Sequence, residues 1–269
     1  MQKVNPFLIL GPLGSIIIGF LSIIIWKIRG NVEVRYFLLG GLVWGISIAP
    51  KIAMDFTLTP RLNSWAKDTF SITGLLIILG IYVGLRTGLL ECGFAFLAFS
   101  RTRLRKATLE EATAFGVGFG ATEAILIGFP SLMQILMFIV NPSILESLSP
   151  AQRKIIESSL NSPTWVTIAP VVERTFTLFA HIFASVLIYI SVAQQKPNLL
   201  LIAILYKTAL DSMVPYIQTM INIDMPITLL EAEVWVIIMG SIGLFGTFYL
   251  RKKHQEALRR NNYEGEILR

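Results

Sequence analysis

The chain has 269 residues, of which 54% are hydrophobic and only 15% are charged, and its mean hydropathy is +0.67. Soluble domains carry about 25% charged residues, so the composition excludes a soluble globular protein and indicates a polytopic membrane protein. The net charge of +6 gives no reason to expect nucleic-acid binding, because most basic residues fall in short loops and in the C-terminal tail.

Seven apolar runs along the chain are long enough to cross a bilayer, which takes about 20 helical residues. They predict helices over residues 7–26, 36–54, 69–99, 112–139, 164–193, 198–221 and 228–250. The expected fold class is therefore all-α, a polytopic membrane helix bundle of about seven transmembrane helices. We expect the third, fourth and fifth runs, which exceed the thickness of a bilayer, to tilt, to break or to project beyond it. The candidate break points are Gly84, Gly88, Gly128 with Pro130, and Pro170.

Positively charged residues are unevenly divided between the two sets of loops. The loops at 27–35, 100–111 and 194–197, together with the tail, hold 14 lysines and arginines, and the opposite set holds five. The positive-inside rule therefore predicts an outer N-terminus and a cytoplasmic C-terminus for a multi-pass protein of the cell membrane. We expect residues 1–250 to form a single transmembrane bundle and residues 251–269 to form a basic cytoplasmic tail.

Among the charged side chains inside the predicted spans, we single out eight. A charged side chain at mid-bilayer costs roughly 2.5 to 3.5 kcal/mol, so eight of them facing lipid would cost on the order of 20 kcal/mol or more. They must therefore face inward, toward one another or toward a wet cavity, and we expect the function to lie there. The acids are Glu91, Glu123, Glu173 and Asp211, the bases are Lys51, Arg86, Arg174 and Lys207, and His181 lies among them.

Glu173 and His181 are the pair with the clearest chemical potential. Eight residues of helix place them roughly 80° apart around the axis and about 12 Å apart along it, so they can line one cavity without touching. A carboxylate and an imidazole in a water-excluded pocket could activate water, with the glutamate as base and the histidine holding an oxyanion or a metal. The alternative is a structural charge cluster of Glu173 and Arg174, with His181 as an ordinary interior histidine.

Two further pairs of charges are close in sequence. Lys207 and Asp211, at positions i and i+4, share a helix face and are expected to form a salt bridge. Glu91 follows Arg86 by five residues and could pair with it loosely. The small residues that precede Glu123 favour the close approach of another helix backbone.

Taken together, these segments resemble the YhfC family of intramembrane proteases, relatives of the glutamic group that includes the CAAX-processing prenyl endopeptidases. The resemblance covers roughly residues 84–216, and Lys51 fits the second span of the family. The family pattern is a Glu-Glu pair followed closely by Arg, a GxGHGGxEA helix, a Glu-Arg segment with a histidine some eight residues on, and an HxxxD motif.

The chain keeps part of this pattern and departs from it at four positions. The residues that match are Glu91, Glu123, Glu173, Arg174, His181 and Asp211. Cys92 stands where the second glutamate of the pair is expected, and Phe94 or Ala95 stands where the arginine is expected. Phe119 and Lys207 stand where two histidines are expected. Every departure therefore replaces a residue of the catalytic type.

The resemblance implies candidate catalytic residues and charge-balancing residues. The former are Glu91, Glu123, Glu173, His181 and Asp211, and the latter are Arg174, Lys207, Lys51 and Arg86. Because of the departures, we expect a non-catalytic pseudoprotease, a membrane subunit that binds a partner or a transmembrane segment in a larger complex such as a transporter. The alternative is an active intramembrane glutamic or metallo-endopeptidase that cleaves a membrane peptide. A small transporter or proton relay that uses the buried acids is a third interpretation.

The expected partners are the lipid bilayer and another membrane protein or peptide. Neither nucleotide nor nucleic acid is expected, because the sequence holds no P-loop, GxGxxG, HExxH or CxxC motif. No cofactor is expected either. Under the enzyme alternative a divalent metal such as zinc would bind near His181, although one histidine with carboxylates makes a poor zinc site.

Overall fold

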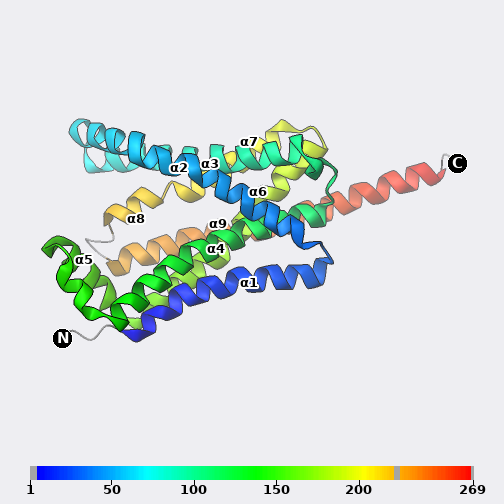
Figure 1. Cartoon of the computed structure of the whole chain (residues 1–269). Helices are drawn as coiled ribbons and strands as arrows, with labels where there is room; N and C mark the ends of the chain where they lie inside the picture. The colour runs from blue at the N-terminus through cyan, green and yellow to red at the C-terminus, as the bar shows by residue number, and fades with distance from the viewer. Residues whose placement is uncertain (1–4, 221–224, 268–269) are drawn as a thin grey trace.

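The computed structural model describes residues 5–220 and 225–267, and within these ranges the chain forms α-helices joined by short 3₁₀ turns, with no β-strand (Figure 1). The long helices are α1 (Leu10–Gly30), α2 (Val34–Thr69), α3 (Ile72–Arg101), α4 (Leu109–Val140), α6 (Ile168–Ala193), α7 (Pro197–Asp211) and α9 (Met225–Ile267). The shorter elements are α5 (Pro150–Leu160), α8 (Val214–Met220), η1 (Pro6–Ile9), η2 (Arg103–Lys106), η3 (Pro142–Ser147) and η4 (Thr164–Thr167).

Seven helical stretches of the described chain are long and apolar enough to cross a membrane. They follow the seven predicted spans in order, which confirms the predicted all-α bundle. α1 begins at the end of the bundle that carries α5, which we term the α5 end, and α9 projects from the opposite end (Figure 1). The outer location of the α5 end stays a prediction from the loop charges.

The second span is longer than predicted. The sequence indicated a helix over 36–54 and an outer loop over 55–68, whereas α2 continues to Thr69 through two internal prolines. An ion pair between Asp55 and Arg86 ties this extension to α3. Pro50 and Pro60 do not end the helix.

The sixth span is interrupted at a point where no break was predicted. α7 ends at Asp211, two turn residues follow, and α8 begins at Val214. In the turn, Ser212 donates its N–H to the carbonyl of Thr208 and its hydroxyl to the carbonyl of Ala209. Irregular backbone at membrane depth is tolerated where it is buried in protein or lines a cavity, and this turn borders the cavity described below.

The breaks predicted at glycine and proline positions are wrong. α3 and α4 run without interruption through Gly84, Gly88 and Pro130, and Pro170 lies in the first turn of α6, where proline is tolerated. Gly84 and Gly88 instead permit close packing, since a Cβ on Gly84 would lie 2.3 Å from the carbonyl oxygen of Thr208 in α7. Small residues let two helix backbones approach in this way, and the approach brings the charged residues of α3 and α7 together.

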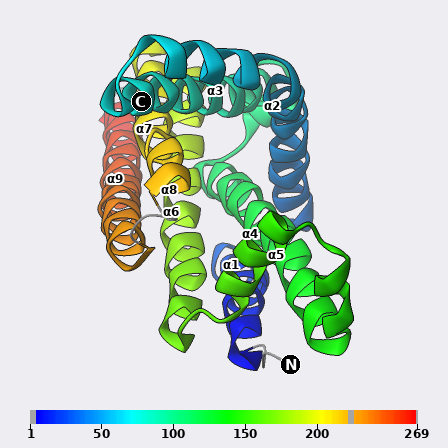
Figure 2. The same ribbon diagram turned by 90° about the vertical axis from the view of Figure 1, so that its left-hand side faces the viewer.

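α6 lies at the centre of the bundle, packed against α1, α4, α7 and α9 (Figure 2). Its most apolar window is 67% buried, against 39% or less in each of the other six spans. Beside it, α2 and α4 cross closely at Gly118, where a Cβ would lie 2.0 Å from the carbonyl oxygen of Phe37. This crossing places Trp44 of α2 next to Glu123 of α4.

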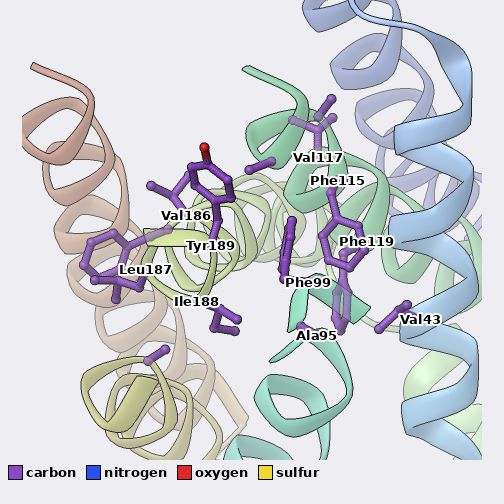
Figure 3. Close-up of a cluster of buried hydrophobic side chains, with 14 of the residues drawn as sticks. Val43, Ala95, Phe99, Phe115, Val117, Phe119, Val186, Leu187, Ile188 and Tyr189 are labelled. Atoms are coloured by element: carbon purple, nitrogen blue, oxygen red, sulfur yellow. The ribbon is translucent and has the colours of Figure 1, made fainter. Parts of the chain in front are cut away.

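An apolar core fills the half of the bundle that is remote from the α5 end. Figure 3 shows Phe99 of α3 and Phe115 and Phe119 of α4 gathered near Ile188 and Tyr189 of α6. The ring centroids of Phe99 lie 4.8 Å from those of Phe115 and 5.9 Å from those of Tyr189. Glu91, Glu123 and Lys207 lie beyond this core, toward the α5 end.

Candidate functional site

A cavity of about 500 Å³ lies in the α5-end half of the bundle, between α2, α3, α4, α6, α7, α8 and the beginning of α9. We term it the charged cavity. Of the nine site residues predicted from the sequence, those that line it are Lys51, Glu91, Glu123, Glu173, Arg174, His181, Lys207 and Asp211. Five different helices therefore bring their ionisable side chains to one space.

Glu91 of α3 lies deep in the charged cavity, where its side chain is only 4% exposed. Its Oε1 accepts a hydrogen bond of 2.6 Å from Lys51 Nζ, and its Oε2 lies 3.0 Å from Lys207 Nζ. The Lys207 side chain is buried to the same degree. Two ammonium groups, from α2 and α7, thus share one carboxylate in a setting where an unpaired charge would be strongly destabilising.

Lys207 was predicted to pair with Asp211, and the structure pairs it with Glu91 instead. Within the described part of the chain, no ion pair within 4 Å joins Lys207 to Asp211. At i, i+4 spacing a base that precedes an acid is the weaker orientation. The close approach of α3 and α7 offers Lys207 a better partner, a carboxylate that is itself buried.

Glu123 of α4 is surrounded by three donors. Its Oε1 accepts a hydrogen bond of 2.6 Å from Arg174 Nη1, and its Oε2 accepts one of 2.9 Å from Trp44 Nε1. His181 Nε2 lies 3.0 Å from the same Oε2, although not along a hydrogen-bonding direction. The other ring nitrogen of His181 lies 3.9 Å from Glu91 Oε2. His181 therefore stands between the two deepest glutamates.

Three more acids line the shallower part of the charged cavity. Glu173 pairs with Arg174, but 42% of its side chain remains exposed. Asp211 lies at the end of α7, next to the turn, and has no ion-pair partner within 4 Å among the described residues. Glu233 of α9, which was not predicted, also lines the cavity, and its Oε2 is buried without a hydrogen-bond partner.

The predicted balance of four acids against four bases does not hold for this space. Arg86 is absent from the described lining, because it pairs with Asp55 on the extension of α2 and donates to the carbonyl of Lys51. Glu91, to which Arg86 was expected to pair loosely, is taken by the two lysines. With Glu233 added, five acidic side chains face three basic ones in the described lining, so the cavity carries an excess of acid.

Two of the departures from the family pattern lie beside the deep end of the charged cavity. The ring of Phe119 packs on His181, with centroids 4.9 Å apart, and is itself buried against the apolar core (Figure 3). Cys92 is likewise buried, one residue from Glu91. An aromatic hydrocarbon and a thiol thus occupy the places where the resemblance leads us to expect a histidine and a glutamate.

One protein family matches the chain over most of its length. The sequence model of the YhfC intramembrane metalloprotease family matches residues 14–231, a range that contains the charged residues of α2, α3, α4, α6 and α7. The chain belongs to the YhfC family. The predicted resemblance is therefore confirmed. No significant match was found among curated proteins or among solved structures.

The description of the YhfC family implies a metal ion, and the side chains of this member do not fit one. Both carboxylate oxygens of Glu91 and of Glu123 already contact cations or N–H donors of the chain itself. Catalytic zinc usually takes three protein ligands rich in histidine, and His181 is the single histidine of the site. Across the described ranges, no three His, Cys, Asp or Glu side chains form a group that could hold a metal ion.

Three residues that shape the site were not predicted. Glu233 lies inside the last predicted span, so the rule that identified the other buried charges also applied to it. Asp55 was assigned to a loop, because the extension of α2 was not foreseen. Trp44 gave no signal, since an indole in a membrane helix is common and its role as a donor to Glu123 emerges only from the crossing of α2 with α4.

Proposed function

We propose that this member of the YhfC family has lost catalysis and binds a segment of a partner membrane protein in its charged cavity, as a subunit of a larger complex in the cell membrane. The observation behind this proposal is the state of the two deepest glutamates. All four of their carboxylate oxygens contact a cation or an N–H donor supplied by the chain.

These contacts leave neither glutamate ready to act as a general base. A base must lie within hydrogen-bond reach of the water that it activates and must accept its proton. Glu91 would first have to release a lysine, and Glu123 would have to release Arg174 or Trp44. Removing one partner from a buried ion pair costs about 3–5 kcal/mol, because the other charge is left uncompensated. The charges therefore stabilise the bundle in its present arrangement.

The shallower part of the cavity has the properties of a binding site. Glu173, Asp211 and Glu233 supply more acid than the described bases neutralise, so a basic or polar side chain of a partner is the complementary guest. A volume of about 500 Å³ corresponds to roughly one turn of a helix that is 10–12 Å wide. The guest is therefore one or two side chains of a partner segment rather than a whole helix.

Crosslinking in intact cells tests the binding role. A photoreactive amino acid at Ile217, on the wall of the charged cavity in α8, should form an adduct with one membrane protein, and mass spectrometry should map the crosslink to a membrane-spanning segment. Leu38, an exposed apolar position of α2 outside the cavity, is the matched control. Asp211→Asn should reduce the Ile217 adduct several-fold. An adduct with lipid alone, or one that Asp211→Asn leaves unchanged, would contradict the proposal.

Proteolysis by the purified protein tests the loss of catalysis. The full-length chain in lipid nanodiscs should leave transmembrane peptides intact, with or without added zinc. The active intramembrane endopeptidase is established instead if a peptide is cleaved, the cleavage is lost in Glu123→Gln, and it persists in Glu33→Gln, which changes an exposed acid outside the spans' interior.

A further inference from the structure

A second cavity of about 500 Å³ lies in the other half of the bundle, along a different face of α6. α1 and α9 form its walls, and α4 and α6 form its floor. We term it the apolar groove. Its walls include large apolar side chains that are exposed at the surface of the bundle, among them Leu21, Ile25 and Phe248. The groove therefore opens toward the medium that surrounds the spans.

The length of the apolar groove matches one leaflet of a bilayer. Along α1 its lining runs from Ile18 to Arg29, and eleven residues of α-helix correspond to about 16 Å. Half of a hydrocarbon core of about 30 Å is about 15 Å. The groove thus extends from the depth of the lipid headgroups to near the middle of the membrane.

The headgroup end of the apolar groove is basic. Arg29 of α1 and Arg251 of α9 both line it. Arg251 is fixed in place by a hydrogen bond of 2.5 Å to Glu110 Oε1 and by its position 4.9 Å from the ring centroid of Trp26. Arg29 is exposed and has no ion-pair partner in the part of the chain that the structure describes. Tryptophan at a span end is typical of the interfacial depth, so Trp26 places these cations where phosphates lie.

The basic end of the apolar groove indicates which occupant it suits. A groove of about 500 Å³ that opens toward lipid can accommodate an extended hydrocarbon chain, and an arginine at its headgroup end adds an attraction for a phosphate. A basic pocket between transmembrane helices is a recognised form of site for anionic lipid headgroups.

We propose that the apolar groove is a binding site for an anionic phospholipid, with one acyl chain between α1 and α9 and the phosphate at Arg29. The floor residues Leu178 and Ile182 of α6 contact the acyl chain, and Arg251, already neutralised by Glu110, shapes the end of the groove. The site does not involve the charged cavity, and its occupancy is independent of whether that cavity binds a partner.

Native mass spectrometry of the full-length chain tests this site. Protein exchanged into nanodiscs of equal parts phosphatidylglycerol and phosphatidylethanolamine, and then released into mild detergent, should retain one phosphatidylglycerol molecule. Leu21→Trp, which fills the groove from α1, should abolish the retained lipid, and Leu38→Trp, the same change at an exposed position of α2, should not. Asp211→Asn in the charged cavity should leave the retained lipid unchanged.

The charge preference gives a second measurement that does not depend on filling the groove. Arg29→Gln should lower the ratio of retained phosphatidylglycerol to phosphatidylethanolamine about fivefold, the effect expected for one basic residue near the membrane surface. Arg61→Gln, at an exposed arginine toward the α5 end, should leave the ratio unchanged. Equal lipid retention by Leu21→Trp and Leu38→Trp would overturn the proposal, and so would a second protein chain that Leu21→Trp releases.

Discussion

The charged cavity and the apolar groove have about the same volume and are both lined by α4, α6 and α9, yet their chemistry is opposite. α6 turns Arg174 and His181 toward the first and Leu178 and Ile182 toward the second. Residues one position apart in a helix differ by about 100° around its axis, so neighbours in sequence serve different spaces. The central helix of the bundle thus separates a polar half from an apolar half.

This difference in chemistry determines which contacts hold the walls of each cavity together. Charge at membrane depth must be met by opposite charge on the protein, so the walls of the charged cavity are joined by ion pairs. Apolar side chains are as compatible with lipid tails as with one another, so the walls of the groove need no contact across it. We therefore expect the stability of the bundle to depend strongly on the first space and weakly on the second.

Lys207→Met gives the largest expected effect. It removes one of the two ammonium groups from Glu91, and the loss of a partner from a buried ion pair costs about 3–5 kcal/mol of unfolding free energy. Reversible unfolding in mixed micelles measures it, with Lys196→Met, at an exposed lysine that contacts only Gln194 among described side chains, as the control. Glu91→Gln, which leaves both Lys51 and Lys207 without their shared carboxylate, should cost at least as much. A loss of unfolding free energy below about 1 kcal/mol in Lys207→Met would contradict the expectation that the charged cavity is important for stability.

Gly118→Ala should have an intermediate effect. A Cβ there meets the backbone of Phe37, so α2 and α4 must separate, and overpacking of this kind costs about 1–3 kcal/mol. The same unfolding measurement applies, and the contact between Trp44 and Glu123 should loosen, which the tryptophan emission reports. Gly45→Ala on the facing helix α2, where a Cβ meets nothing within 4 Å, is the control. Equal effects of the two changes would contradict the close crossing.

Arg86→Gln should have the smallest effect. Its partner Asp55 is half exposed, and ion pairs open to solvent contribute about 0–1 kcal/mol. The unfolding free energy of Arg86→Gln is informative because the sequence predicted that Arg86 would lie with Lys51, Arg174 and Lys207, which the structure places in the charged cavity. If Arg86→Gln lowers the unfolding free energy as much as Lys207→Met does, the Asp55–Arg86 pair stabilises the bundle as strongly as the buried pairs, and the expected difference is wrong.

The fold was predictable wherever the bilayer itself imposes the rule. Seven long apolar runs give seven spans, because only a helix satisfies its own backbone groups in lipid. The extension of α2 and the turn after Asp211 were not predictable, since both depend on contacts with α3 that are remote in sequence. Gly84 and Gly88 show the ambiguity clearly, because a glycine can mark a break or a close approach, and only the neighbouring helix decides.

The sequence predicted which residues line the candidate site better than it predicted which acid pairs with which base. The high cost of charge in lipid forces ionisable residues inward whatever the details of the fold, and this rule identified the lining acids and bases except Glu233. Which acid meets which base depends on how helices cross. Lys207 has Asp211 on its own helix and Glu91 on another, and the sequence could not show that α3 comes close enough for Glu91 to be the partner.

α9 is one uninterrupted helix of 43 residues, about 65 Å long and so about twice the hydrocarbon thickness. Its backbone lies closest to α6 around Gly240, where a Cβ would lie 2.6 Å from the carbonyl oxygen of Phe176. From there Glu233 in the charged cavity is about 10 Å away along the helix, and the end at Ile267 is about 40 Å away in the other direction. A tilt of α9 about this contact would therefore move its C-terminal end about four times as far as Glu233.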